Sequence, residues 1–225
     1  MSLKNYIKNK KVNHFTFFDI EVFVKDPITN NISAKMVLNK IRELIPSFML
    51  RGIDSIYIGN FEFLNKRKVQ AMYENSSIFV TNKQDTLEDM IDDIVHEISH
   101  SLEEIYGSFI YSDGKIEREF LQKRKKLWMS LKSKNIDVDL SDFLKTGFSY
   151  KFDNFLYQEV GYPLLSAITA NLFYSPYAAT SLREYYANGF ETFFLKEDID
   201  RLKSISPTLY NKIANLIINY GEEPR

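Results

Sequence analysis

Residues 85–106, DTLEDMIDDIVHEISHSLEEIY, form the stretch that decides the fold. Its apolar residues recur at helical spacing, Asp85 and Glu88 have the spacing of a capping box, and Gly107 is a natural helix stop. The pattern predicts one long amphipathic helix that ends at Gly107. Its apolar stripe is expected to consist of Leu87, Ile91, Ile94, Ile98, Leu102 and Ile105.

The segment His96-Glu97-Ile98-Ser99-His100 lies within this helix and has the form H-E-x-x-H. Histidines four residues apart project from one face of a helix, so both imidazoles are expected to share one zinc ion. Glu97 lies about 100° round the helix from His96, next to the metal, where a general base for an activated water is needed. Chance produces such a pattern about once in a few hundred sequences of this composition.

A structural interpretation of the same face competes with the metal site. The histidines point away from the apolar stripe, which argues against a buried structural pair. The other alternative is a solvated, charged helix face. It rests on the acidic residues of this side, Asp89, Asp93, Glu103 and Glu104. Scattered surface histidines have no reason to bracket a glutamate at this spacing, so we favour the metal site.

A catalytic zinc site also needs a third protein ligand and an open fourth position. No third histidine follows His100 at the spacing of a metzincin. Asp93 and Glu104 lie in line with the histidines on one helix and cannot easily close a tetrahedron. His14 is remote, and we expect it to be an incidental histidine. The third ligand is therefore expected from another helix.

The predicted helix 181–195 offers two candidates, Glu184 and Glu191, which share the side opposite its apolar stripe. Glu184 also fits a capping box with Ser181, which is its competing structural explanation. The spacing alone favours Glu184 slightly and leaves Glu191 as its rival.

The residues before the long helix predict a small sheet, and those after it predict helices. Strands are expected at 16–25, 53–58 and 77–81, with a helix over 33–45. Further helices are expected at 115–134, 140–145, 155–172, 181–195, 198–203 and 207–220. The basic run 123–126 is expected to be a solvated helix face. We therefore expect one α+β domain with a small mixed or antiparallel sheet, an α/β lobe over about 1–107 and a helical lobe over about 108–225.

The composition limits the other functions that the chain can have. Of its 225 residues 44% are hydrophobic and 26% charged, which suits a packed core, and the formal charge of −1 provides no global field for nucleic acid. The absence of cysteine excludes disulfides, thiolate metal sites and a cysteine nucleophile. No apolar run approaches the roughly 20 residues of a membrane span, and we find no signal peptide. We expect a cytoplasmic protein, with non-classical export and a viral origin as open alternatives.

Two stretches together resemble a known family. HEISH and the later stretch EYYANGFETFF, residues 184–194, are similar to the motifs of gluzincin metallopeptidases of the anthrax lethal factor type, including the secreted Pro-Pro endopeptidases. Their second motif resembles E-F-F-A-E-x-F, with a tyrosine seven residues before its first glutamate. Tyr177 stands seven residues before Glu184. The similarity covers about 78–106 and 174 to the C-terminus.

The resemblance implies a zincin-like fold with Zn²⁺ as its cofactor. It implies that His96, His100 and Glu184 bind zinc, that Glu97 is the catalytic base, and that Tyr177 stabilises the oxyanion. Asn188 departs from the family, because an acidic residue is expected there. The pattern E-x-x-A-N-x-F is also similar to small cytoplasmic metallopeptidases of mobile elements that cleave phage repressors.

We therefore expect a zinc-dependent endopeptidase that hydrolyses peptide bonds through a metal-activated water. Its substrate is expected to be a protein or peptide bound as an extended strand, paired with the strand at about 78–81. Neither nucleic acid nor a membrane span is expected, and the oligomeric state stays open. The alternative is a catalytically silent zincin-like binding or structural protein, such as a phage-related one. The intact Glu97 argues against it, because a structural site needs no general base.

Overall fold

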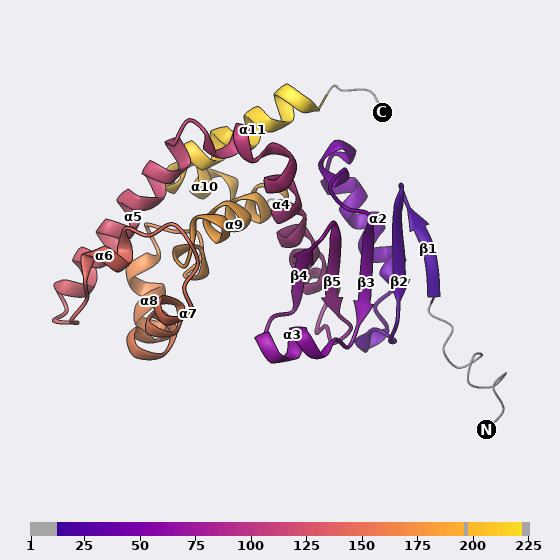
Figure 1. Cartoon of the computed structure of the whole chain (residues 1–225), viewed down its shortest axis with the longest axis horizontal. Coiled ribbons are helices and arrows are strands. Elements are labelled where there is room, and N and C mark those ends of the chain that lie inside the picture. The colour runs from indigo at the N-terminus through magenta and orange to yellow at the C-terminus, as the bar shows by residue number, and fades with distance from the viewer. Residues whose placement is uncertain (1–12, 196–197, 222–225) are drawn as a thin grey trace. The chain divides into compact units, whose positions relative to one another are not determined.

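A five-stranded mixed sheet forms the centre of the first part of the computed structural model, which describes residues 13–195 and 198–221 (Figure 1). The strand order is β1-β2-β3-β5-β4. Strands β2, β3 and β5 are parallel, and β1 and β4 pair antiparallel at the two edges. The strands are β1 (Asn13–Phe17), β2 (Ile20–Val24), β3 (Ser55–Gly59), β4 (Ala71–Glu74) and β5 (Ser77–Thr81).

One face of this sheet belongs to the hydrophobic core. Its alternating residues are almost fully buried, and they are Val22, Ile56, Ile58, Ile78 and Val80. Buried apolar residues of α2 (Ala34–Leu44) and α4 (Leu87–Tyr111) complete the core. Two short 3₁₀ helices, Thr29–Asn31 and Ser47–Leu50, and α3 (Glu62–Arg67) connect the strands.

The opposite face carries a ladder of stacked rings. His14, Phe23, Tyr57 and Phe79 are direct cross-strand partners on β1, β2, β3 and β5. Their ring centroids lie 4.6, 5.0 and 5.0 Å apart in that order. Aromatic cross-strand pairs of this kind stabilise a sheet and fix its register. His14 is thus part of the ladder and also pairs with Glu21.

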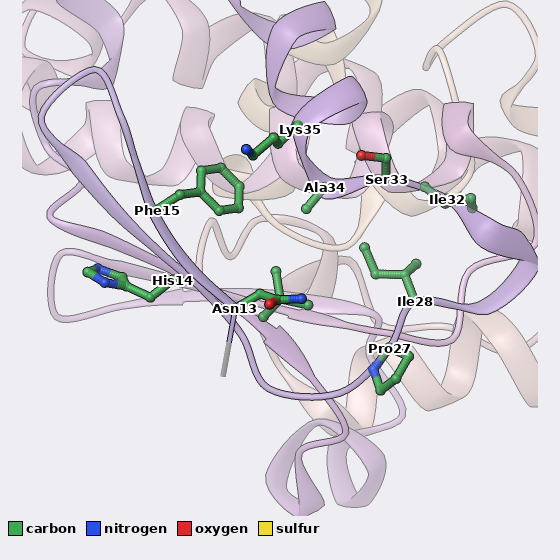
Figure 2. Close-up of a pocket in the computed structure, with 10 residues that line it drawn as sticks. Asn13, His14, Phe15, Pro27, Ile28, Ile32, Ser33, Ala34 and Lys35 are labelled. Carbon is green, nitrogen blue, oxygen red and sulfur yellow. The ribbon is translucent and has the colours of Figure 1, made fainter. Parts of the chain in front are cut away.

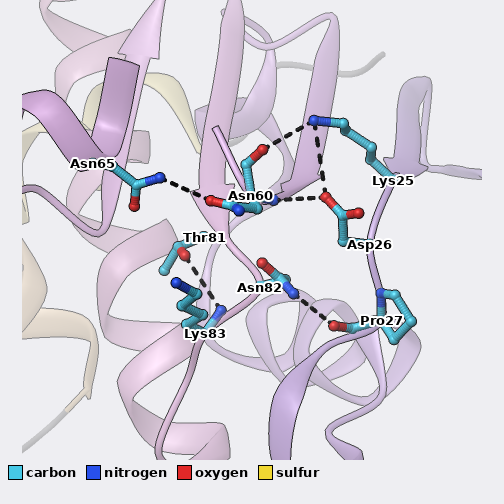
Figure 3. A network of polar contacts seen from close by, with 8 residues as sticks. All are labelled: Lys25, Asp26, Pro27, Asn60, Asn65, Thr81, Asn82 and Lys83. Atoms are coloured by element: carbon cyan, nitrogen blue, oxygen red, sulfur yellow. Dashed lines mark hydrogen bonds and ion pairs between the residues drawn. The ribbon is translucent and has the colours of Figure 1, made fainter. Parts of the chain in front are cut away.

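Polar contacts tie together the loops that follow the parallel strands (Figure 3). Asn60 donates its backbone N–H to Asp26 Oδ2 at 2.8 Å, and its carbonyl accepts from Lys25 Nζ at 2.9 Å. Asn82 Nδ2 donates to the carbonyl of Pro27 at 2.8 Å. These contacts hold the loop that leads from β5 into α4.

The chain divides into two compact units, Met1–Ile105 and Tyr106–Arg225. The second unit is helical. Its helices are α5 (Lys115–Lys132), α6 (Leu140–Phe143), α7 (Tyr150–Asn154), the π-helical η3 (Phe155–Gly161), α8 (Tyr162–Thr169), the 3₁₀ turn η4 (Tyr177–Ala179), α9 (Leu182–Leu195), α10 (Ile199–Ile205) and α11 (Pro207–Tyr220). The expected α+β class, with a mixed sheet and a helical C-terminal region, is confirmed.

Several expected boundaries were wrong. The strand expected at 16–25 is a hairpin of β1 and β2, with Phe18 at φ +53° in its turn. Strand β4 and α3 were not expected at all. The helix α4 runs through Gly107 to Tyr111, because Ile110, fully buried, continues its apolar pattern. The helix expected at 155–172 is broken into η3 and α8.

Within the described residues 13–195 and 198–221, no helix combines the length and the apolar character that crossing a membrane requires.

Candidate metal centre

Reciprocal capping bonds set the start of α4. Thr86 Oγ1 accepts from the backbone N–H of Asp89 at 3.0 Å, and Asp89 Oδ2 accepts from the N–H of Thr86 at 3.0 Å. The capping box thus lies one residue later than the expected pair Asp85 and Glu88. This cap and the buried Ile94, which is 0% exposed, fix the rotation of the helix about its axis.

His96 and His100 lie next to each other on α4. Their ring centroids are 5.1 Å apart and their planes are nearly perpendicular, at 82°. His96 is half-buried and His100 is buried, while Asp89 and Glu104 of the same side are exposed. Two adjacent imidazoles held on a regular helix are a common pair of zinc ligands.

Glu103 orients one of these imidazoles. Its Oε2 lies 3.1 Å from Nδ1 of His100, one helical turn away, and both side chains are only 9% exposed. A carboxylate that accepts from Nδ1–H leaves Nε2 as the ligand atom and increases its basicity. Glu103 was one of the acidic residues on which the competing interpretation of a solvated helix face rested. Its position three residues after His100 was the signal for this contact.

Glu97 is buried, at 8% exposed, and contacts strand β4. The backbone N–H of Tyr73 donates to Glu97 Oε2 at 2.6 Å. The N–H of Thr81 on β5 donates to the carbonyl of Gln70, and in an antiparallel pair hydrogen-bonded and non-hydrogen-bonded positions alternate. Ala71 and Tyr73 are therefore at non-hydrogen-bonded positions, and their backbone N–H and carbonyl groups point away from β5. Glu97 therefore lies at the free edge of the sheet.

Strand β5 was expected to pair with the substrate, and this expectation was wrong. It is hydrogen-bonded to β3 on one side and to β4 on the other, so it has no edge to offer. Sequence reasoning missed β4 because its four residues, Ala71–Glu74, carry no clear alternation. Its turn, Asn75 and Ser76, has positive φ at both positions, as in a tight hairpin.

Two other acids of α4 bind different partners. Asp93 accepts from Gln84 Nε2 at 2.9 Å, and burial raises the pKa of Asp93 to about 6, aided by the charge of Glu97 and opposed by the Gln84 bond. Glu104 accepts from the Tyr73 hydroxyl at 2.7 Å. Burial, and then Glu104, raise the pKa of this hydroxyl to about 12. Both carboxylates thus accept hydrogen bonds from residues of the first unit, and we do not assign either of them as the third ligand.

In the second unit, Glu184 lies in the first turn of α9. Its backbone N–H donates to Ser181 Oγ at 3.2 Å, so Ser181 caps the helix as the alternative explanation proposed. Glu184 and Glu191 are both half-buried. Asn188, one turn after Glu184, is 8% exposed, and its Oδ1 has no hydrogen-bond partner among the described residues. A buried acceptor of this kind is costly unless a donor reaches it.

Tyr177 begins the turn η4, with its side chain 44% exposed. The carbonyl of Tyr177 accepts from Thr180 Oγ1 at 2.8 Å and from the N–H of Thr180 at 3.0 Å. Arg124 Nη1 donates to the carbonyls of Ala179 and Thr180 at 2.7 and 3.2 Å. The turn is thus held through its backbone.

A separate pocket of about 470 Å³ lies beside β1 (Figure 2). Its lining combines the strand residues Asn13, His14 and Phe15 with the segment from Pro27 to Lys35. Among the described lining residues, His14 and Lys35 are the titratable ones, and His14 pairs with Glu21. The pocket offers no set of metal ligands.

No protein-family model, curated protein or solved structure matches this chain. The functional argument therefore depends on the side chains described above.

Proposed function

We propose that the chain is a zinc-dependent endopeptidase with a zincin-like fold. His96, His100 and Glu184 are its zinc ligands, Glu97 is its general base, and Tyr177 stabilises the oxyanion. The observation that carries the proposal is the pair of imidazoles on α4, 5.1 Å apart, with Glu103 on Nδ1 of His100. Glu97, which lies between the two histidines in sequence, is buried, and a structural histidine pair has no need of a general base.

The donor set suits zinc. Each of the three proposed ligands offers one ligand atom, from two imidazoles and one carboxylate. This set is the one that catalytic zinc sites use when they keep a position for water. When bound, zinc lowers the pKa of a water molecule and polarises the substrate carbonyl.

Glu97 performs the proton transfer. Its carboxylate accepts a proton from the attacking water while the water oxygen bonds to the carbonyl carbon of the substrate. The same carboxyl group then donates the proton to the leaving amine nitrogen as the peptide C–N bond breaks. The contact with the Tyr73 N–H holds Glu97 at the sheet edge, where an extended substrate lies.

The substrate is a peptide segment that adds to β4 as an extended strand. Ala71 directs its backbone N–H and carbonyl towards the free edge, and Tyr73 directs its carbonyl there, while the N–H of Tyr73 donates to Glu97. Pairing with these groups gives main-chain affinity that does not depend on the peptide sequence. The Tyr177 hydroxyl donates a hydrogen bond to the oxyanion that forms on the substrate carbonyl.

Two substitutions test the proposal. Glu97→Gln keeps the size of the side chain but removes the base, so we expect zinc content to be unchanged and peptide cleavage to fall about 10²- to 10⁴-fold. Glu184→Ala is expected to lose zinc, measured by metal analysis of the purified protein. Glu191→Ala is the matched control and is expected to keep both zinc and cleavage.

Other outcomes would redirect the assignment. Zinc retained by Glu184→Ala but lost by Glu191→Ala assigns the third ligand to Glu191. Wild-type protein that binds zinc yet cleaves no member of a peptide library, with or without chelator, is a metal-binding protein rather than an enzyme.

A further inference from the structure

The second unit has a pocket beside Tyr177. It has a volume of about 230 Å³ and is lined mostly by apolar surface. Leu156 and Leu165 line it and are almost fully buried, at 1% and 2% exposed. Tyr157 and Tyr162 line it as well but are 56% and 53% exposed, so they form its rim.

The backbone that builds this pocket is unusual. Tyr157 belongs to the π-helix η3, and Tyr162 begins α8 directly after it. Gly161 joins the two with φ +79°, a conformation that side chains disfavour, and Pro163 follows in the first turn of α8. π-Helical turns are rare and occur frequently at functional sites. The segment falls in 108–171, where no family resemblance was found.

Exposed aromatic side chains concentrate in this part of the chain. Among the described phenylalanine, tyrosine and tryptophan residues, the exposed ones all fall between 148 and 177. They are Phe148, Tyr150, Tyr157, Tyr162 and Tyr177. Tyrosine combines a large apolar face with a polar tip and is enriched where proteins bind partners. Tyr157, Tyr162 and Tyr177 line the pocket, whereas Phe148 and Tyr150 lie outside its lining, so the three lining rings indicate a binding surface.

We propose that this pocket receives one large apolar side chain of the peptide substrate, such as phenylalanine or leucine. The inference rests on the proposed function and adds a specificity site to it. Tyr177 links the two, because this residue lines the pocket and is also proposed to act on the substrate carbonyl. A side chain seated here thus belongs to a residue near the cleaved bond.

Size and charge select the occupant. Pockets for small-molecule ligands usually span about 300–1,000 Å³, so a cavity of about 230 Å³ suits a single side chain. Asp153 supplies a carboxyl group to the described lining of the pocket. This carboxyl group disfavours an acidic occupant. The leucine floor provides no partner for the head group of a basic one.

A cleavage assay tests the specificity. Wild-type protein is expected to prefer phenylalanine over alanine at one position of an otherwise identical peptide by about 10- to 100-fold in kcat/KM. The variants Tyr157→Ala and Tyr162→Ala are expected to reduce this ratio about tenfold. The control Tyr150→Ala, 72% exposed and outside the pocket lining, is expected to leave the ratio and the rate unchanged.

A binding assay separates this inference from the proposed function. N-Acetyl-phenylalanine amide, added to the full chain carrying ¹³C-labelled leucine methyl groups, is expected to shift the NMR signals of Leu156 and Leu165. N-Acetyl-alanine amide and N-acetyl-lysine amide are expected to leave them in place. These shifts need neither zinc nor turnover.

The outcomes are distinct. Three results would overturn the specificity site and leave the enzyme assignment intact. They are cleavage without an apolar preference, a preference for lysine, and an apolar preference that survives both Tyr157→Ala and Tyr162→Ala. No cleavage, together with methyl shifts that the rim variants abolish, overturns the enzyme assignment and keeps the apolar site. No cleavage and no shift overturn both.

Discussion

At the scale of single residues, the side chains of Lys123 and Arg124 on α5 are buried, at 6% and 1% exposed. Lys123 Nζ donates to the carbonyls of Leu172 and Ile205 at 2.6 Å each and to Ser206 Oγ at 2.8 Å. Arg124 lies over the Phe152 ring at 3.9 Å and donates to three backbone carbonyls. The expected solvated basic face was therefore wrong at these two positions. Such cations satisfy carbonyl groups that loops leave unpaired.

Lys123 predicts a pH dependence of stability. Burial lowers the pKa of Lys123 from 10.5 to about 8, partly opposed by the charge of Glu119. Below pH 8 both the folded and the unfolded chain hold this proton. Between pH 8 and 10.5 the Lys123 amine is protonated to a larger extent in the unfolded chain than in the folded chain. The free energy of unfolding therefore rises with pH.

The expected gain is up to about 3 kcal/mol across this window. It is measured as the difference in unfolding free energy between wild type and Lys123→Met, by urea unfolding at several pH values. Lys126→Met, at an exposed position of the same helix, should show no such pH-dependent difference. A flat difference between wild type and Lys123→Met would show that the buried amine keeps its ordinary pKa.

At the scale of elements, α9 and α11 approach closely at Gly189. A Cβ atom added there would meet Cγ of Leu209 at 2.8 Å and its Cδ2 closer still. Leu209 is 1% exposed and has little room to move. The glycine within EYYANGFETFF thus serves the packing of α9, the helix that carries Glu184.

Gly189→Ala is expected to lower the free energy of unfolding by about 1–3 kcal/mol, because overpacking outweighs the gain in helix propensity. Gly107→Ala is the matched control inside α4, where an added Cβ meets nothing within 4 Å. That variant is expected to gain up to about 1 kcal/mol. Thermal or urea unfolding measures both, and equal effects of the two substitutions would contradict the close contact.

At the scale of the whole molecule, the proposed zinc ligands come from both units. His96 and His100 belong to Met1–Ile105 and Glu184 belongs to Tyr106–Arg225, while α4 runs from one unit into the other. An ion bound by residues of both units stabilises only the state in which both are folded. Metal binding is therefore expected to couple their unfolding.

Saturating zinc is expected to raise the free energy of unfolding by about 3 kcal/mol at a hundredfold excess over Kd. Scanning calorimetry with zinc and with chelator measures the shift in Tm. In Glu184→Ala the shift should be much smaller, while Glu191→Ala should behave like wild type. An equal shift in Glu184→Ala would mean that the ion binds the first unit alone.

The local sequence pattern was sufficient to predict many of the helices and to identify Glu97, His96 and His100 as the candidate base and imidazole ligands. The bounds of β5 (Ser77–Thr81) and α11 (Pro207–Tyr220) agree with the expected ones, since strand propensity and a proline at the first helical turn are local signals. The strand β4 carried no such signal, because its four residues are held by pairing with β5. Glu103 and Tyr73 became part of the candidate site only through contacts made in the folded chain.

By itself, the sequence determined that His96, Glu97 and His100 lie on neighbouring positions of one helix, because helical periodicity depends on residues a few positions apart. Tertiary structure alone decided which strand is the sheet edge next to Glu97 and that Lys123 and Arg124 are buried. It also decided that α4 continues beyond Gly107. These features depend on residues distant in the chain, whose packing outweighs the local preference of any one residue.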